Sequence, residues 1–154
     1  MSEFLTTYKI TKDWVDYNNH LNMAYYVLIF DKAWEIILEK FQMGETSAKK
    51  TNKSTMVVET HTTYNNEVKE NEDVDIILTH FDHDKKRLHY KLEMIEKNSQ
   101  KLSATIEMIS LYVDLKERRV AEFEQDKLKL MDSFIVANKS KFKSDLKFSS
   151  KLKK

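Results

Sequence analysis

Residues 14–26 read WVDYNNHLNMAYY, and they place several small polar side chains directly before the most hydrophobic segment of the chain. Asp16 is the only acid of this stretch, and three asparagines and His20 accompany it. A helix N-terminus requires only one such side chain as its cap, and Asn22 satisfies that requirement. The other polar groups therefore indicate a functional site at the start of the helix that follows.

The hydrophobic segment predicts a long helix over residues 23–42. Its apolar side chains recur at helical spacing, and acidic residues occupy the other side. The apolar positions are Met23, Val27, Phe30, Trp34, Ile37, Leu38 and Phe41. The first half, MAYYVLIF, is apolar on every side, so we expect it to be deeply buried. Gly44, the only glycine, follows the last periodic residue, where a left-handed residue often ends a helix, and residues 45–54 are expected to form a polar loop.

Five segments have the residue pattern of strands. One short strand is expected at residues 4–10, before the polar cluster. Four runs rich in β-branched, aromatic or alternating apolar residues follow the long helix, at residues 55–65, 73–82, 87–96 and 101–114. The connections between these four runs are short enough for antiparallel neighbours, and residues 125–138 predict a terminal helix. One long apolar helix with one antiparallel sheet predicts a two-layer α+β domain in which the sheet wraps around the helix.

The composition limits the classes of function. A chain of 154 residues is expected to form one domain whose core needs no metal or disulfide for stability. It has no cysteine, which excludes zinc ribbons, disulfide frameworks and thiol catalysis, and its five histidines are scattered. The N-terminal residues show no secretory signal, and charged residues interrupt every long apolar stretch. We therefore expect a soluble cytoplasmic protein.

Charge is unevenly distributed along the chain. Residues 139–154 hold seven lysines and one aspartate, for a net charge of +6, so residues 1–138 carry a net charge of −5. We divide the chain accordingly into a domain at residues 1–138 and a basic tail at residues 139–154. The domain shows no basic face of its own, so nucleic-acid binding is not expected of it. The tail is expected to be solvated and mobile, with contact to RNA, an anionic membrane or another acidic surface as the alternative.

The polar cluster and several other segments carry a family resemblance. The pattern D-x-x-N-H-x-N-x-x-Y-Y begins at Asp16, between the first expected strand and the long helix. It resembles the D-x-x-G-H-x-N motif of hotdog-fold acyl-CoA thioesterases of the 4-hydroxybenzoyl-CoA thioesterase type. The expected order of elements agrees with that fold over residues 5–120. The segments VVETHTTY (57–64), DKKRLHYKLEM (84–94) and ATIEMISLYVD (104–114) are similar to the subgroup associated with carnitine and betaine metabolism.

One position departs from the family motif. Asn19 stands where these thioesterases usually have glycine. Asparagine is the non-glycine residue best able to adopt positive φ, so we expect the turn to survive with a slightly altered approach for substrate. Asn19 is also the only feature that favours the alternative function, a non-catalytic acyl-CoA-binding or structural hotdog protein.

The resemblance implies hydrolysis of an acyl-CoA to free acid and CoA, and it assigns the catalytic carboxylate to Asp16. Thioester hydrolysis needs a nucleophile or a general base, and Asp16 can attack the carbonyl or activate a water. The free N–H groups near Met23, at the helix N-terminus, would form the oxyanion hole. His20 and Asn22 complete the expected catalytic set, with His20 as an orienting group rather than a proton carrier, and Asn19 and Met23 would contact substrate. No metal and no cofactor beyond the CoA of the substrate is required.

Three residues of the expected sheet are further candidates for substrate binding. Glu59 and His61 lie two apart on a strand and so share a face. They either flank the acyl pocket or form a polar pair across strands. Glu107 interrupts an apolar strand. It is either a second acid of the site or an outward-facing residue near an edge.

The strand at residues 101–114 predicts self-association. Its apolar side chains lie on both faces, with Ala104, Ile106 and Met108 on one and Ile109, Leu111 and Val113 on the other. A soluble monomer rarely exposes so much apolar surface. Hotdog domains pair edge to edge and place the site at the interface. The resemblance therefore implies a homodimer, or a dimer of dimers, with equivalent sites.

Overall fold

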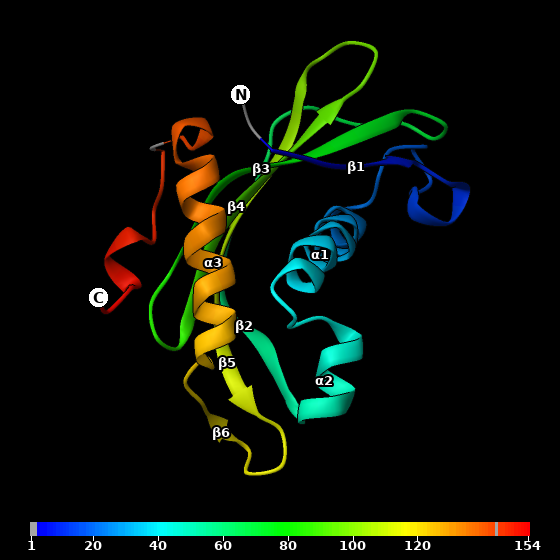
Figure 1. Cartoon of the computed structure of the whole chain (residues 1–154). Coiled ribbons are helices and arrows are strands. Elements are labelled where there is room, and N and C mark those ends of the chain that lie inside the picture. Colours follow the sequence, from blue (N-terminus) through cyan, green and yellow to red (C-terminus); the bar gives the residue numbers. More distant parts are fainter. Residues whose placement is uncertain (1–2, 144) are drawn as a thin grey trace.

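The computed structural model describes residues 3–143 and 145–154. A curled sheet holds the longest helix on its concave side (Figure 1). In chain order the elements are β1 (Glu3–Lys9), a 3-10 turn (Lys12–Trp14), α1 (Met23–Lys40), α2 (Glu45–Thr51), β2 (Lys53–Tyr64), β3 (Asp73–His83), β4 (Arg87–Glu96), β5 (Leu102–Asp114), β6 (Arg119–Val120), α3 (Gln125–Asn138) and two short 3-10 turns (Lys139–Lys141 and Ser149–Lys151). The α+β class and the sheet wrapped around one long helix are confirmed.

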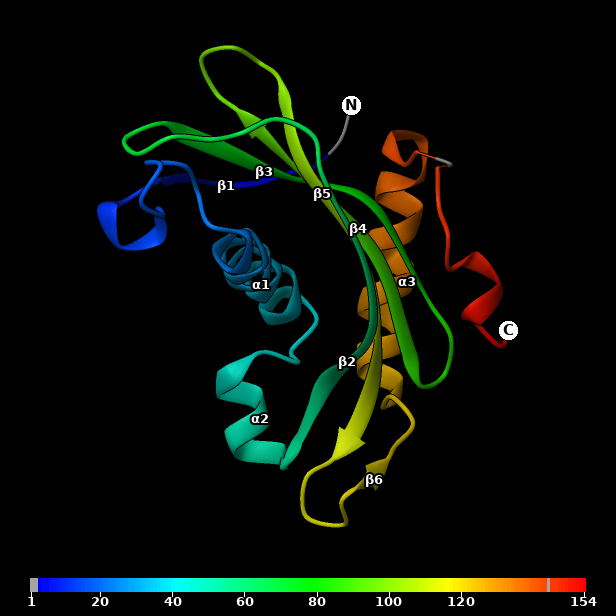
Figure 2. The ribbon, with the colours of Figure 1, turned by 180° about the vertical axis from the view of Figure 1, so that it is seen from behind.

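Every strand pair of the sheet is antiparallel. The order across the sheet is β1-β3-β4-β5-β2, with the short β6 beside β5, so β2 is an edge strand along its whole length (Figure 2). Each of the four long pairs contains one register shift, such as the one between Val57 and Glu59 of β2. An extra residue in one strand bends it and increases its twist, which helps the sheet to curl around α1.

The core lies between α1 and the concave face of the sheet. Trp34 of α1 stacks on Tyr90 of β4 with ring centroids 3.6 Å apart. On β5, Ile106 and Met108 belong to this core, whereas Glu107 between them lies on the opposite face, because side chains alternate along a strand. Burial of each large apolar side chain contributes about 1.5–3 kcal/mol, so this layer fixes α1 to the sheet.

The first half of α1 is less buried than its composition predicts. Tyr26, Ile29 and Phe30 face the sheet and are buried, but Met23, Val27 and Leu28 are exposed. The expectation of deep burial on every side is therefore wrong for a single chain. No helix in the described part of the chain is long and apolar enough to span a membrane.

The prediction for the start of α1 is confirmed, and the prediction for its end is wrong. Asn22 is the N-cap, because its side-chain oxygen accepts the Ala24 N–H at 2.9 Å. At the other end Gln42, with φ 58°, adopts the left-handed conformation that was expected of Gly44, whose φ is −76°. Glycine at position 44 leaves room for the end of the flexible Glu39 side chain, which a Cβ there would displace.

Residues 45–51 form the short helix α2 instead of the expected polar loop. Gly44 is its N-cap, and the Glu35 side chain on α1 accepts the Glu45 N–H at 2.7 Å. Glu45 and Lys49 form an ion pair of 2.7 Å one turn apart, a spacing that favours a helix. Polarity alone could not distinguish this exposed helix from a loop.

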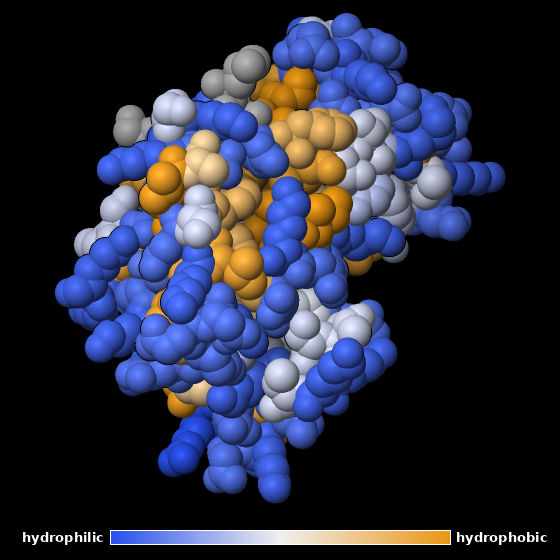
Figure 3. Space-filling view, viewed as in Figure 1, coloured by the Kyte–Doolittle hydropathy of each residue, from blue (hydrophilic) through white to orange (hydrophobic). Residues whose placement is uncertain are grey.

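α3 covers the part of the sheet edge that β1 leaves open. β1 pairs only with residues 73–78 of β3, and α3 lies beside the rest of that strand (Figure 1). There Phe134 of α3 contacts Phe81 of β3 and Phe41, which follows α1, with ring centroids 5.8 and 5.3 Å apart. Hydrophobic residues gather on the surface between α3 and α1, framed by hydrophilic ones (Figure 3).

The tail, residues 139–154, packs on the convex face of the sheet. The Lys143 N–H donates to the Thr79 carbonyl of β3 at 2.9 Å, and Phe148 is buried. The expectation of a solvated, mobile tail is therefore wrong for its described residues. Ile109 on this face is also buried, so the outer face of β5 is not the open apolar surface that the sequence predicts.

Candidate active site at the start of α1

The segment between β1 and α1 is a closed loop around Asp16. Within this loop, residues 14–22 and hereafter the Asp16 loop, Val15 forms an antiparallel bridge with Leu21. The Asp16 N–H donates to the His20 carbonyl at 2.9 Å. Because the two limbs pair, the loop holds Asp16 at the same end of the molecule as the N-terminus of α1.

The Asp16 carboxylate has one oxygen that is held and one that is open. Oδ1 accepts the backbone N–H groups of Asn18 at 2.8 Å and His20 at 3.3 Å, which is the geometry of an aspartate that stabilises a turn. Among the described residues, no hydrogen bond ends on Oδ2. The turn therefore orients the carboxylate and leaves its second oxygen available to a reactant.

Asn19 adopts the conformation that the family glycine would provide. Its φ is 64°, in the left-handed region, as predicted. Its carbonyl accepts the Glu70 N–H at 3.4 Å, which ties the tip of the Asp16 loop to the segment after β2. The replacement of glycine leaves the turn in place.

His20 orients the Asp16 loop through that same segment. Its Nδ1 lies 3.2 Å from Oε2 of Glu67, and its backbone forms an antiparallel bridge with Lys69. The neighbouring Leu21 N–H donates to the Val68 carbonyl at 2.7 Å. These contacts agree with the orienting role expected of His20.

The N-terminus of α1 opens into a hollow. Asn22 caps the Ala24 N–H, but the hydrogen bonds of the described residues include none from the Met23 N–H, and the Met23 side chain is exposed. A cavity of about 360 Å³, hereafter the α1 hollow, lies beside it. Its lining residues are Leu21, Met23, Tyr26, Tyr64, Asn65, Asn66 and Glu67. A helix N-terminus with an open N–H is suited to stabilise negative charge on a reactant in this hollow.

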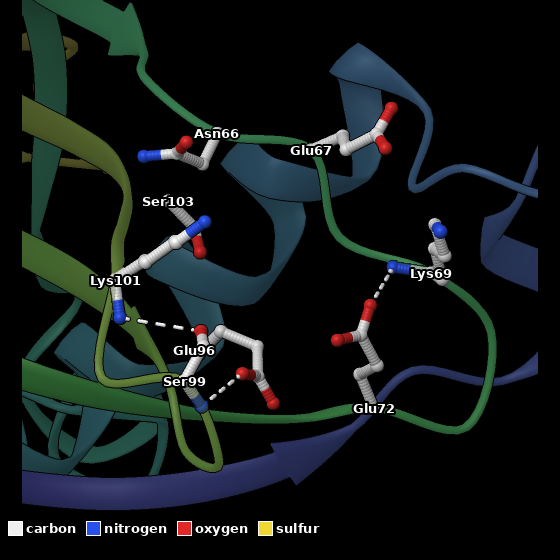
Figure 4. Close-up of a pocket in the computed structure, with 8 residues that line it drawn as sticks. All are labelled: Asn66, Glu67, Lys69, Glu72, Glu96, Ser99, Lys101 and Ser103. Atoms are coloured by element: carbon white, nitrogen blue, oxygen red, sulfur yellow. Dashed lines mark hydrogen bonds between the residues drawn. The ribbon is translucent and has the colours of Figure 1, made fainter.

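A second, more polar cavity of about 310 Å³ adjoins the α1 hollow, and the two share Asn66 and Glu67 (Figure 4). Lys69 and Lys101 line this second cavity. The Ser103 hydroxyl in its wall is buried and has no hydrogen-bond partner among the described residues. Figure 4 shows that the Glu67 side chain points away from Lys101 across the cavity.

Glu59, His61 and Glu107 lie together, but away from the Asp16 loop. His61 of β2 is directly opposite Glu107 of β5, and both lie on the convex face. Glu59 forms an ion pair of 3.4 Å with Lys151 of the tail. Within one chain the structure therefore separates these residues from Asp16, and their role in substrate binding stays a prediction.

Glu107 belongs to a buried polar cluster under the tail. His89 Nε2 lies 2.8 Å from its Oε1, and the Lys147 and Phe148 N–H groups donate to the same carboxylate. Burial raises the pKa of Glu107, but the hydrogen bonds from His89 and the two N–H groups outweigh it and leave the pKa below its usual range. Burial and then the charge of His89 lower the pKa of the adjacent His80 to about 4.

Tyr64 and Glu67 were not among the site residues predicted from the sequence. They come together because β2 ends beside the start of α1, a relationship between segments about 40 residues apart along the chain. Tyr26 does belong to the family-like pattern that begins at Asp16, so it was the one available signal for an aromatic wall.

Known proteins match the chain in sequence and in fold. The profile of the thioesterase-like superfamily matches residues 10–148. The chain belongs to this superfamily. A betainyl-CoA thioesterase of Pseudomonas aeruginosa is 31% identical over 142 residues, which cover 91% of this chain and 89% of that relative. The resemblance and the enzyme class expected from the sequence, a thioesterase, are thereby confirmed.

Solved structures show the same thioesterase fold. A protein from Staphylococcus aureus, solved in complex with CoA, superimposes with a TM-score of 0.81 at 21% identity and covers all of this chain and 95% of its own. A putative thioesterase from Pseudomonas putida gives a TM-score of 0.80 at 22% identity, with 100% and 97% of the two chains covered. A 1,4-dihydroxy-2-naphthoyl-CoA thioesterase from Synechocystis gives 0.74 at 14% identity, with 84% and 95% covered.

Proposed function

We propose that the chain hydrolyses an acyl-CoA thioester to a free acid and CoA, with its chemistry at the N-terminus of α1. The observation that carries this proposal is the Asp16 loop, where an oriented carboxylate lies at the same end of the molecule as a helix N-terminus whose first N–H, that of Met23, is open. Hydrolysis of a thioester needs these two elements, a carboxylate and donors for the developing negative charge.

In this mechanism Asp16 supplies the carboxylate. Its Oδ2 either attacks the thioester carbonyl or takes a proton from the attacking water. The bonds from Asn18 and His20 to Oδ1 support the role because they fix the orientation of the side chain before substrate binds.

The oxyanion that forms on the thioester carbonyl would be stabilised by the Met23 N–H. The partial positive charge of the α1 N-terminus adds to this effect. Asn22 supports the arrangement because it occupies the Ala24 N–H and leaves that of Met23 open. Removal of one such donor typically costs a factor of about 100–1000 in rate.

The active unit in this proposal is a homodimer joined along β2. Three consecutive apolar residues of this edge strand, Met56, Val57 and Val58, are exposed, as are Met23 and Val27 on the adjacent side of α1. Pairing of two β2 edges would continue the sheet and cover these side chains. The site at the start of α1 would then be completed by the partner subunit.

The related Pseudomonas aeruginosa protein is named for betainyl-CoA, so betainyl-CoA is the first substrate to assay, within a panel of short-chain, aryl and long-chain acyl-CoAs. The Asp16→Asn variant keeps the size of the side chain and should lower thiol release by about a hundredfold or more. Asp13→Asn, on the exposed turn before the Asp16 loop, is the matched control and should retain activity. Parent-like turnover by a folded Asp16→Asn protein would show that Asp16 is not the catalytic group.

A further inference from the structure

We propose that the α1 hollow selects acyl groups that carry a fixed positive charge, and that Tyr26, Tyr64 and Glu67 form the site that binds the charged group. The inference rests on the proposed thioesterase function, since it names the class of acyl group that the same site accepts. It concerns the walls of the α1 hollow and assigns no part in the bond-breaking step to these three residues.

Two tyrosines form adjacent walls of the hollow. The rings of Tyr26 and Tyr64 have centroids 5.2 Å apart and planes at 83°, so they meet nearly at a right angle. Tyr26 is fixed in α1 and is buried, whereas Tyr64, at the end of β2, is 47% exposed and presents its ring to solvent. Aromatic ring faces carry negative charge and attract quaternary ammonium groups, so the exposed ring of Tyr64, packed against Tyr26, offers such a face to the hollow.

The hollow is also negatively charged. Among the described residues no lysine or arginine lines the hollow, and Glu67 is the one carboxylate that does. Its Oε2 faces His20, and no contact of a described residue involves Oε1. Burial is the main cause of the raised pKa of Tyr26, and the negative charge of Glu67 adds to it, so the carboxylate acts on this ring electrostatically.

The neighbouring cavity differs from the α1 hollow in the positively charged side chains of its wall. Lys69 and Lys101 line it, and positive side chains would repel a cationic acyl group. Figure 4 places Glu67 at its border, with the side chain directed away from Lys101. The cationic group therefore fits on the tyrosine side of Glu67, next to the open N–H of Met23.

Two thioesters of the same shape test the proposal. Betainyl-CoA carries a trimethylammonioacetyl group. It and 3,3-dimethylbutanoyl-CoA differ only in the replacement of the charged nitrogen by carbon. We expect kcat/KM to favour the cationic ester by about tenfold or more, as a desolvated cation–π contact with an adjacent carboxylate should provide. Glu67→Gln and Tyr64→Leu should each lower this ratio about tenfold, whereas Tyr64→Phe should keep it, because the ring remains.

Glu70→Gln is the matched control, since it removes the same charge from the same loop at a residue that lines neither cavity. It should leave the ratio within twofold of the parent value. Equal hydrolysis of both esters, or a Glu67→Gln variant with the parent ratio, would overturn the inference and leave the proposed thioesterase function standing. Hydrolysis of neither ester, nor of any acyl-CoA in the panel, would instead overturn the proposed function and this inference with it.

Discussion

The backbone N–H of Lys147 donates to both carboxylate oxygens of Glu107, at 2.9 and 2.8 Å, and so joins the tail to the middle of β5. Phe148 adds a further N–H at 2.8 Å, and His89 Nε2 lies at the same distance from Oε1. A buried carboxylate without these partners would be costly, and the tail N–H groups would lose theirs. The acid that interrupts an apolar strand is therefore the anchor of the chain's last segment.

Glu107→Gln should weaken this anchor. The amide keeps the shape of the side chain but loses the charge, and its NH2 group faces N–H donors. Unfolding by urea should show a loss of about 2 kcal/mol or more, and the lysine-rich tail should become sensitive to trypsin before the domain does. Glu117→Gln, at an exposed turn, is the control and should change neither property. Equal stability and equal protection of the tail in the two variants would contradict the anchoring role.

The free energy of unfolding should fall between pH 6.5 and pH 4 because of His80. Its pKa is about 4 in the folded protein against 6.5 for the ordinary group, so the unfolded chain binds a proton that the folded chain rejects between these values. The stabilisation is present above pH 6.5 and is lost as the pH falls towards 4, by about 1–2 kcal/mol, because His80 is only partly buried. Glu107, whose folded pKa is lowered from its ordinary 4.5, contributes fully above pH 4.5 and loses its contribution as the pH falls further.

Urea unfolding at a series of pH values checks this expectation. His80→Gln should unfold with a weaker pH dependence between pH 6.5 and 4 than the parent. Thr60→Gln, at an exposed residue of β2 that does not titrate, serves as the control and should keep the parent slope. An unchanged slope in His80→Gln would assign the acid sensitivity to other groups.

The sequence predicted the parts that depend on local pattern, and it missed the parts that depend on contacts between distant segments. Asn22 as a cap and the positive φ of Asn19 follow from residue type alone. The placement of the tail does not, because seven closely spaced lysines suggest mutual repulsion and an extended segment. The tail is held instead by Glu107, which accepts backbone N–H groups that lie 40 or more residues further along the chain.

The same limit applies to the candidate site. The Asp16 loop is contiguous in sequence, so a motif could identify it, whereas Tyr64 and Glu67 reach the site only through the fold. Glu59 and His61 were grouped correctly on one face by the period of a strand. Periodicity cannot say which of the two faces is the convex one, and that face is where they lie.

Assembly through β2 should be sensitive to charge at its exposed apolar residues. Val58 is 55% exposed on the edge strand, and Val58→Glu would place a carboxylate in the interface of a β2-linked dimer. We expect this variant to be a monomer in light scattering and to lose most of its thioesterase activity. Val136→Glu on α3, where the side chain is 81% exposed, introduces the same charge elsewhere and should remain dimeric and active.

A parent protein that is monomeric and active at micromolar concentration would exclude the dimer. So would a Val58→Glu protein that stays dimeric, since two valines cannot be replaced by buried like charges without a large cost. Either result would leave the exposed apolar residues of β2 without a covering partner, which is unusual for an edge strand.

Substitutions at Asn19 test whether this position needs the left-handed conformation that the family's glycine provides. With φ at 64°, the position suits glycine and asparagine and disfavours a residue with an ordinary Cβ. Asn19→Gly should therefore keep both the stability and the thioesterase activity within about twofold in kcat/KM, whereas Asn19→Ala should lose about 1 kcal/mol of unfolding free energy. The strain in the alanine variant would act on the bonds that orient Asp16, because Asn18 and His20 flank this position. Its activity should consequently fall more than that of the glycine variant. An Asn19→Ala protein with the stability and turnover of the parent would show that the left-handed turn is not what holds the carboxylate in place.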